Sequence, residues 1–143
     1  MTLRVLVCGG RHFGRVYAGI DGSKQGLVEY QFILDTLNRL SLDWPKRPED
    51  EYGNWLPDVV VISGKAPGVD TVAIDWAVVN WCQFEEYPAN WKKYGKRAGY
   101  LRNRQMLIEG KPDLVVAFPG GPGTEMMKKL AREHGLEVKE IAY

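Results

Sequence analysis

A short turn of small residues is the feature of this sequence best suited to binding chemistry. Residues 119–124 read PGGPGT and stand between an apolar run and a segment with helical spacing. Glycine lets an anion approach the backbone because no Cβ is in the way, and the amides at a helix N-terminus carry partial positive charge. The turn therefore predicts a phosphate site, and the residues expected to form it are Pro119, Gly120, Gly121, Gly123 and Thr124.

Three further loops follow strand-like runs. They lie at residues 9–11, at 63–70 (SGKAPGVD) and at 88–91 (PANW), and the first two are rich in glycine. Because the carboxyl ends of parallel strands meet at one edge of a sheet, we expect these loops and the PGGPGT turn to surround one ligand. The additional contacts expected from them are Gly9, Gly10, Arg11, Ser63, Gly64 and Lys65.

A basic run supplies a candidate partner for an anion. Residues 92–104 contain six lysines and arginines, among them Arg102 and Arg104 on either side of Asn103. Arg102 and Met106 are four residues apart and so share one helix face. We expect Arg102 to pair with a phosphate, since arginine can do so with two parallel hydrogen bonds, and we place Asn103 beside it in the site.

Other kinds of site have little support. The Walker pattern GxxxxGK[ST] and the dinucleotide fingerprint GxGxxG are both absent from the sequence, which argues against Walker-type ATP hydrolysis and ordinary hydride transfer with NAD. Cys8, Cys82, His12 and His134 have no companions at metal-ligand spacing. No metal and no cofactor is therefore expected, and both cysteines are interpreted as buried, reduced thiols.

The elements that must position these loops follow from hydrophobic spacing. Apolar runs predict strands at residues 3–8, 58–62, 84–87, 113–118 and 137–141. Helices are predicted at residues 27–40, 71–81, 95–109 and 124–134, with Asp70 as the N-cap of the second. Continuous apolar strands that alternate with helices are typical of a three-layer α/β/α Rossmann-like fold with a mainly parallel sheet of about five strands.

Two segments interrupt this alternation, and one of its helices is unusually apolar. Residues 11–25 form a long glycine- and charge-rich connection, and residues 42–57 are expected to be a surface excursion at the edge of the sheet far from the binding loops. The helix at residues 71–81 is apolar almost all round and includes Trp76 and Trp81. It should be buried in the fold or in a subunit interface, so a homo-oligomer is expected.

Length and charge set the general class of protein. The chain has 143 residues, which suits a single domain over residues 1–143. A formal net charge of +1 argues against a dedicated nucleic-acid coat. No signal peptide and no membrane-spanning run is evident, so we expect a cytoplasmic protein that has no membrane partner and binds a small molecule.

The motifs resemble those of a known superfamily. PGGPGT is similar to the PGGxGT motif of the LOG phosphoribohydrolases, whereas SGKAPGVD at 63–70 and RNR at 102–104 resemble elements of the DNA-processing protein A family. Both families belong to the SLOG superfamily of Rossmann-like domains, and nearly the whole chain resembles its YspA-like branch, with similar motifs at residues 8–11, 76–77 and 88–100. The resemblance implies binding of nucleotides or their derivatives, as a sensor or a processing enzyme.

One difference from the LOG motif helps to choose between the hypotheses about function. The LOG motif extends to PGGxGTxxE, with a catalytic glutamate where this chain has Met127. We therefore favour a nucleotide-binding module over a nucleoside 5′-monophosphate phosphoribohydrolase, in which Arg102 would act with Asp70 or Glu125 as the acid/base. A third hypothesis, single-stranded nucleic acid stacked on Trp91, Tyr94 and Tyr100, is the least favoured because of the near-neutral charge.

Overall fold

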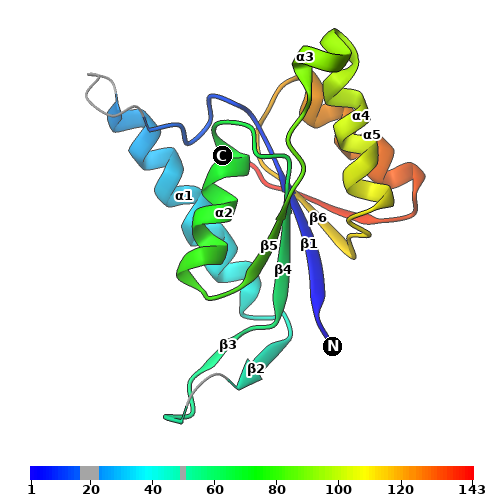
Figure 1. The fold of residues 1–143 in the computed structure, drawn as a ribbon. Coiled ribbons are helices and arrows are strands. Elements are labelled where there is room, and N and C mark those ends of the chain that lie inside the picture. The colour runs from blue at the N-terminus through cyan, green and yellow to red at the C-terminus, as the bar shows by residue number, and fades with distance from the viewer. Residues whose placement is uncertain (17–22, 49–50) are drawn as a thin grey trace.

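The computed structural model describes residues 1–16, 23–48 and 51–143, and its centre is a five-stranded sheet (Figure 1). The strands lie in the order β5-β4-β1-β6-β7, and every neighbouring pair is parallel. Their bounds are Leu3–Cys8 for β1, Val59–Ser63 for β4, Gln83–Glu86 for β5, Leu114–Ala117 for β6 and Glu137–Glu140 for β7. The expected Rossmann-like parallel sheet is confirmed.

Helices cover both faces of this sheet (Figure 1). Helices α1 (Ser23–Ser41) and α2 (Val69–Val79) pack on one face, and α4 (Ala98–Ile108) and α5 (Pro122–Glu133) pack on the other. Successive side chains of a strand point to opposite faces, so Val5 and Val7 belong to the first core and Leu6 and Cys8 to the second. Within the described ranges, no helix is long and apolar enough to span a bilayer.

The basic segment after β5 differs from the single helix expected at residues 95–109. It forms three pieces, namely α3 (Trp91–Tyr94), a 3-10 turn η1 (Gly95–Arg97) and α4. The Asn90 side chain accepts a hydrogen bond from the Lys93 amide and so caps α3. Gly95 has φ +56°, a left-handed conformation that interrupts the helix and that glycine adopts readily. The strand before it, β5, begins one residue earlier than expected.

The starts of α1, α2 and α5 also differ from the expectation, and α1 begins at Ser23, four residues before the expected start. Gly68 is the N-cap of α2, so the prediction of Asp70 as the cap is wrong, and Asp70 lies buried in the first turn. Helix α5 begins at Pro122, two residues before the expected start. A proline suits this first position because its fixed φ is helical and its missing N–H would have no partner there. Thr124 consequently lies inside the first turn.

The excursion at residues 42–57 contains an antiparallel pair of short strands, β2 (Lys46–Pro48) and β3 (Trp55–Pro57). As expected, this hairpin lies at the end of the sheet opposite α3 (Figure 1). Strands of three residues are too short to show an alternating pattern in the sequence, which is why they were not predicted. Residues 49–50 of this excursion and 17–22 of the connection at 11–25 lie outside the described residues.

The apolar helix α2 divides its large side chains between core and surface. Trp76 is buried, donates a hydrogen bond from Nε1 to Asn38 Oδ1 at 2.8 Å and meets the ring of Trp44 edge-on. Trp81 follows the end of the helix and is exposed, as are Val78 and Val79. Trp76 therefore stabilises the fold and is inaccessible to a subunit interface.

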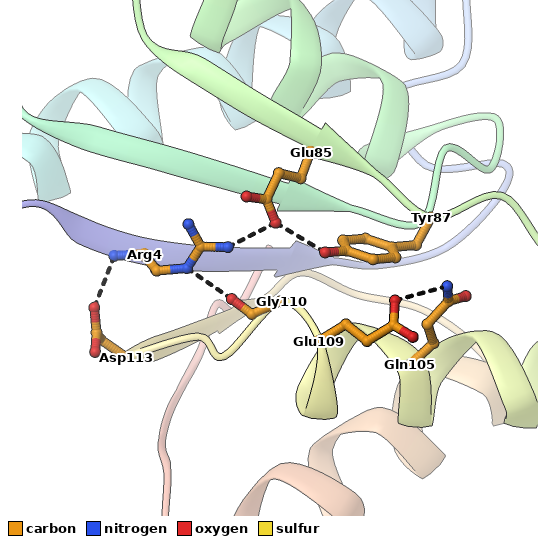
Figure 2. Close-up of polar contacts among 7 residues, drawn as sticks. All are labelled: Arg4, Glu85, Tyr87, Gln105, Glu109, Gly110 and Asp113. Atoms are coloured by element: carbon orange, nitrogen blue, oxygen red, sulfur yellow. Dashed lines mark hydrogen bonds and ion pairs between the residues drawn. The ribbon is translucent and has the colours of Figure 1, made fainter.

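A polar cluster fastens the C-terminal end of α4 to the sheet (Figure 2). The Arg4 guanidinium donates to the Gly110 carbonyl at 2.7 Å and to Glu85 Oε1 at 2.6 Å, while the Arg4 amide donates to Asp113 Oδ2 at 2.9 Å. Tyr87 also donates to Glu85 Oε1, and burial together with this carboxylate raises the pKa of Tyr87 to about 12. Strands β1 and β5 are thus tied to the turn that follows α4.

Candidate functional site

The predicted binding loops meet at one edge of the sheet, because β1, β4, β5 and β6 run in the same direction. The Gly10 amide donates to the Pro119 carbonyl at 2.8 Å, which joins the loop after β1 to the turn after β6. The Val69 amide donates to the Gly10 carbonyl and joins α2 to the same loop. The chain leaves β1 towards β4 on one side and leaves β6 towards β7 on the other, and such switch points are where open α/β sheets bind ligands.

A cleft of about 780 Å³ opens at this point, a volume within the usual range for small-molecule sites. Loops after β1 and β6, the start of α2 and the segment from α3 to α4 contribute its walls. The structure brings together most of the residues predicted from sequence; those that line the cleft are Gly9, Gly10, Arg11, Asp70, Arg102, Asn103, Pro119, Gly120, Gly121, Gly123 and Thr124.

The PGGPGT turn is open towards the cleft. Gly121 is the N-cap of α5, and apart from the adjoining residues and the helix's own backbone no described heavy atom lies within 4 Å of where a Cβ would stand at Gly121 or Gly123. Gly120 differs, because a Cβ there would overlap the Thr124 hydroxyl and approach the Gly10 amide. Thr124 is buried beneath Gly120. The first-turn amides have no partner inside the helix, so the turn can accept an anion.

Arg102 is held in position by two hydrogen bonds. Its Nη1 donates to the Gly64 carbonyl at 2.7 Å and its Nε donates to the Asn103 side-chain oxygen at 3.0 Å. Asn103 in turn donates from Nδ2 to the Gly123 carbonyl at 3.3 Å, which connects α4 to the first turn of α5. These contacts occupy only part of the five N–H groups of a guanidinium. Arg102 is therefore positioned beside the turn with donors left for a ligand.

Asp70 places a carboxyl group near this arginine. Its Oδ2 accepts the Ala66 amide at 3.3 Å, and a Cβ at Gly64 would lie within 3 Å of both Asp70 Oδ2 and Arg102 Nη1. Burial raises the pKa of Asp70 to about 6, and the Arg102 charge and the Ala66 amide limit that rise. Asp70 can therefore hold or release a proton near neutral pH.

Four predicted site residues do not line the cleft. Ser63 is fully buried, where its hydroxyl donates to the Asp70 carbonyl and accepts the Lys65 amide. Gly64 lies behind Arg102 and leaves room for the guanidinium. Lys65 pairs through Nζ with Glu86 at 3.0 Å, and Glu125 is exposed and pairs with Lys128. Ser63 and Gly64 thus position Asp70 and Arg102.

Sequence reasoning missed part of the cleft wall. Its apolar floor includes Cys8, Met106, Met126 and Met127, and burial raises the pKa of the Cys8 thiol and keeps it protonated. Met127, at the position of the LOG glutamate, is 1% exposed. The loop at 88–91 was expected at this edge and its Trp91 lines the cleft, whereas Tyr100, which also lines it, was predicted only as a contact for single-stranded nucleic acid.

The cleft combines a cationic side with an apolar side. Arg11, Lys96 and Arg102 line it, whereas Asp70 is the single acidic residue lining it among the parts of the chain that the structure describes. The helix α5 dipole adds positive potential at the glycine turn. This arrangement can hold an anionic group at the turn and an apolar or aromatic group against the remaining wall.

Comparison with known proteins identifies the family of this chain. A model of the YspA, cpYpsA-related SLOG family matches residues 3–94. The chain belongs to this family. It is also 36% identical over 90 residues to the "Gene 61 protein" of Mycobacterium phage D29, an alignment covering 56% of this chain and 69% of that protein. No solved structure matches the chain.

The part of this SLOG chain that the family model matches carries three of the four cleft loops. It includes Gly10, Arg11, Asp70 and Trp91, whereas Arg102 and the PGGPGT turn come later in the sequence. These later residues are joined to the matched part by the Gly10–Pro119 and Arg102–Gly64 hydrogen bonds. Both parts therefore build one cleft.

Proposed function

We propose that this SLOG protein binds a nucleotide or nucleotide-derived ligand as a sensor or binding module, with a phosphate on the PGGPGT turn. The observation that carries the proposal is the open backbone at Gly121 and Gly123, at the N-terminus of α5 and inside a cleft of about 780 Å³. Backbone amides at such a helix end bind phosphate without further side chains. Membership of a SLOG family gives independent support for a nucleotide-related role.

The charges of the cleft support the same ligand class. Arg102 lies beside the first turn of α5, linked to it through Asn103 and the Gly123 carbonyl. Arg11 follows Gly10, whose amide is bonded to the turn. Two arginines beside a helix N-terminus favour a phosphate, which arginine can bind with paired hydrogen bonds.

A thermal-shift screen with AMP, ADP, cyclic AMP and ADP-ribose tests the proposal. At least one of these ligands should raise Tm, because a ligand at about 100 times its Kd stabilises the folded state by about 2.7 kcal/mol. No shift with any of them would contradict the proposal.

A glycine variant tests whether the turn is responsible. Gly123→Ala should fold at least as stably as the parent, since alanine is favoured in helices by up to about 1 kcal/mol and its methyl group meets open space. That methyl group points towards the helix N-terminus and should abolish the ligand-induced shift. Glu133→Ala, at the exposed other end of α5, is the matched control and should keep the shift.

A phosphoribohydrolase is the second candidate, and Asp70 is the observation that favours it. This carboxyl lines the cleft near Arg102, and its pKa of about 6 allows it to act as a general acid or base. Cleavage of an N-glycosidic bond needs such a group, and Met127 cannot supply it. Chromatography of free base released from AMP, IMP, CMP and GMP tests this reaction. Release that Asp70→Asn and Arg102→Ala abolish would establish it, whereas no release would exclude it for these substrates.

A further inference from the structure

Arg11 and Trp91 contact each other in the wall of the cleft. The Arg11 Cζ lies 4.9 Å from the centre of the Trp91 ring, and both residues line the cleft. Arg11 follows Gly10, which is bonded to the turn that holds Pro119, whereas Trp91 opens α3 above the same edge of the sheet (Figure 1). The Arg11 side chain therefore reaches from the glycine turn to the aromatic wall.

The Trp91 indole is supported on its edge. A Cβ at Gly99 would lie 3.2 Å from Cη2 of the indole, so the glycine in α4 lets the ring lie close to that helix. The Asn90 cap fixes the start of α3 and with it the backbone of Trp91. Trp91 is still 46% exposed. The cleft thus presents a positioned aromatic ring that is only partly covered.

The planar guanidinium of Arg11 lies over the Trp91 ring, a position that a stacked nucleobase could occupy instead. Both groups stack on aromatic faces, and arginine forms stronger, charge-assisted hydrogen bonds with phosphate. We propose that Trp91 is the stacking platform for the aromatic base of the ligand, and that Arg11 occupies this place in the free protein and moves to the phosphate on binding. This inference rests on the proposed function and narrows it to ligands that carry a base.

The test compares ligands that carry a base with one that lacks it. Calorimetric titration compares AMP, GMP, CMP and UMP with ribose 5-phosphate, which has the phosphate and sugar alone. Trp91→Ala should weaken the best-bound nucleotide about 10-fold or more, the loss expected for one stacked base, and change the affinity for ribose 5-phosphate by less than about twofold. Arg11→Gln should weaken both ligands alike, because this arginine is assigned to the phosphate.

Two more variants keep the test decisive. Trp91→Phe retains an aromatic face and should keep most of the nucleotide affinity, while the fluorescence change that the nucleotide causes in the parent protein should disappear. Trp55→Ala removes an exposed tryptophan in β3, at the opposite end of the sheet, and should leave every affinity unchanged.

The contrary outcomes are distinguishable. Equal losses for the nucleotide and for ribose 5-phosphate in Trp91→Ala, or no loss for either, would overturn the base platform and leave the phosphate site intact. Failure of the parent protein to bind any nucleotide would overturn the proposed function and this inference together.

Discussion

Asp70 is a buried carboxyl group, and its ionisation lowers the free energy of unfolding. Burial raises its pKa from 3.8 to about 6, so between these values the folded protein binds more protons than the unfolded chain. The free energy of unfolding therefore decreases as pH rises from about 4 to 6, and the full penalty is present above pH 6. A shift of roughly two units corresponds to about 3 kcal/mol, because one pKa unit is worth 1.36 kcal/mol.

We therefore predict that Asp70→Asn is more stable than the parent at pH 7 by up to about 3 kcal/mol, and that the difference disappears near pH 4. Urea unfolding at both pH values measures this. Asp113→Asn, which removes a carboxylate bonded to the Arg4 amide outside the cleft, is the comparison and should not stabilise the protein. An Asp70→Asn variant that is less stable than the parent at pH 7 would show that the ionised carboxylate is favoured by its surroundings.

At the scale of residues, the sequence predicted the cleft residues that contribute backbone groups. It was less successful for residues whose orientation depends on side-chain packing. Glycine composition and a following helix were enough to locate the PGGPGT turn. Gly64 and Ser63 were also expected to touch the ligand, yet they position Arg102 and Asp70 from behind. A loop sequence shows which residues are small or polar, but the side of the loop that faces the cleft depends on the helices packed against it.

At the scale of elements, the Arg4 cluster holds α4 against the sheet (Figure 2). Arg4→Met keeps the aliphatic length of the side chain but removes the hydrogen bonds to Gly110 and Glu85. We predict a loss of about 1.5–3 kcal/mol in the free energy of unfolding, the range for hydrogen bonds to charged groups. Chemical denaturation measures it.

The matched control for this variant is Lys139→Met in β7, which removes a charge from an exposed position at the edge of the sheet. It should change stability by less than about 0.5 kcal/mol, as surface substitutions usually do. Equal stability of Arg4→Met and the parent would mean that the cluster in Figure 2 does not fasten α4.

The elements themselves were predictable to different degrees. Long apolar runs gave the strands β1, β4 and β6 and their parallel arrangement, because both faces of these strands are covered. Gly95 was a sequence signal for the break between α3 and α4, because glycine readily adopts the positive φ that the structure shows there. The β2–β3 hairpin had no such signal. Each of its strands has only three residues, and the side chains of β2 are largely exposed.

At the scale of the whole molecule, the position of the cleft follows from chain topology. The strand order β5-β4-β1-β6-β7 places the switch point between β1 and β6, and the loops that follow these two strands carry Gly10 and the PGGPGT turn. Sequence reasoning could predict that the loops share one edge. It could not predict the cleft's apolar floor, because Met106 and Met127 approach each other only when α4 and α5 pack together.

The exposed apolar residues at the end of α2 lead us to predict that the chain self-associates. Val78, Val79 and Trp81 are accessible in the structure, and contiguous exposed apolar side chains often mark contacts between proteins. We predict that the chain self-associates and that Val79→Glu shifts it towards the monomer. Size-exclusion chromatography with light scattering measures both. A parent protein that remains at 16.2 kDa at high concentration would contradict this expectation.

The most direct test of the central claim is a titration of the ¹⁵N-labelled protein with AMP, ADP, cyclic AMP and ADP-ribose, followed by amide NMR. If the glycine turn binds the phosphate, the amide resonances of Gly121, Gly123 and Thr124 should move and saturate with at least one of these ligands. The amide of Gly135, past the other end of α5, should stay in place. Saturable binding that leaves the three turn amides unmoved would contradict the claim, as would the absence of any response.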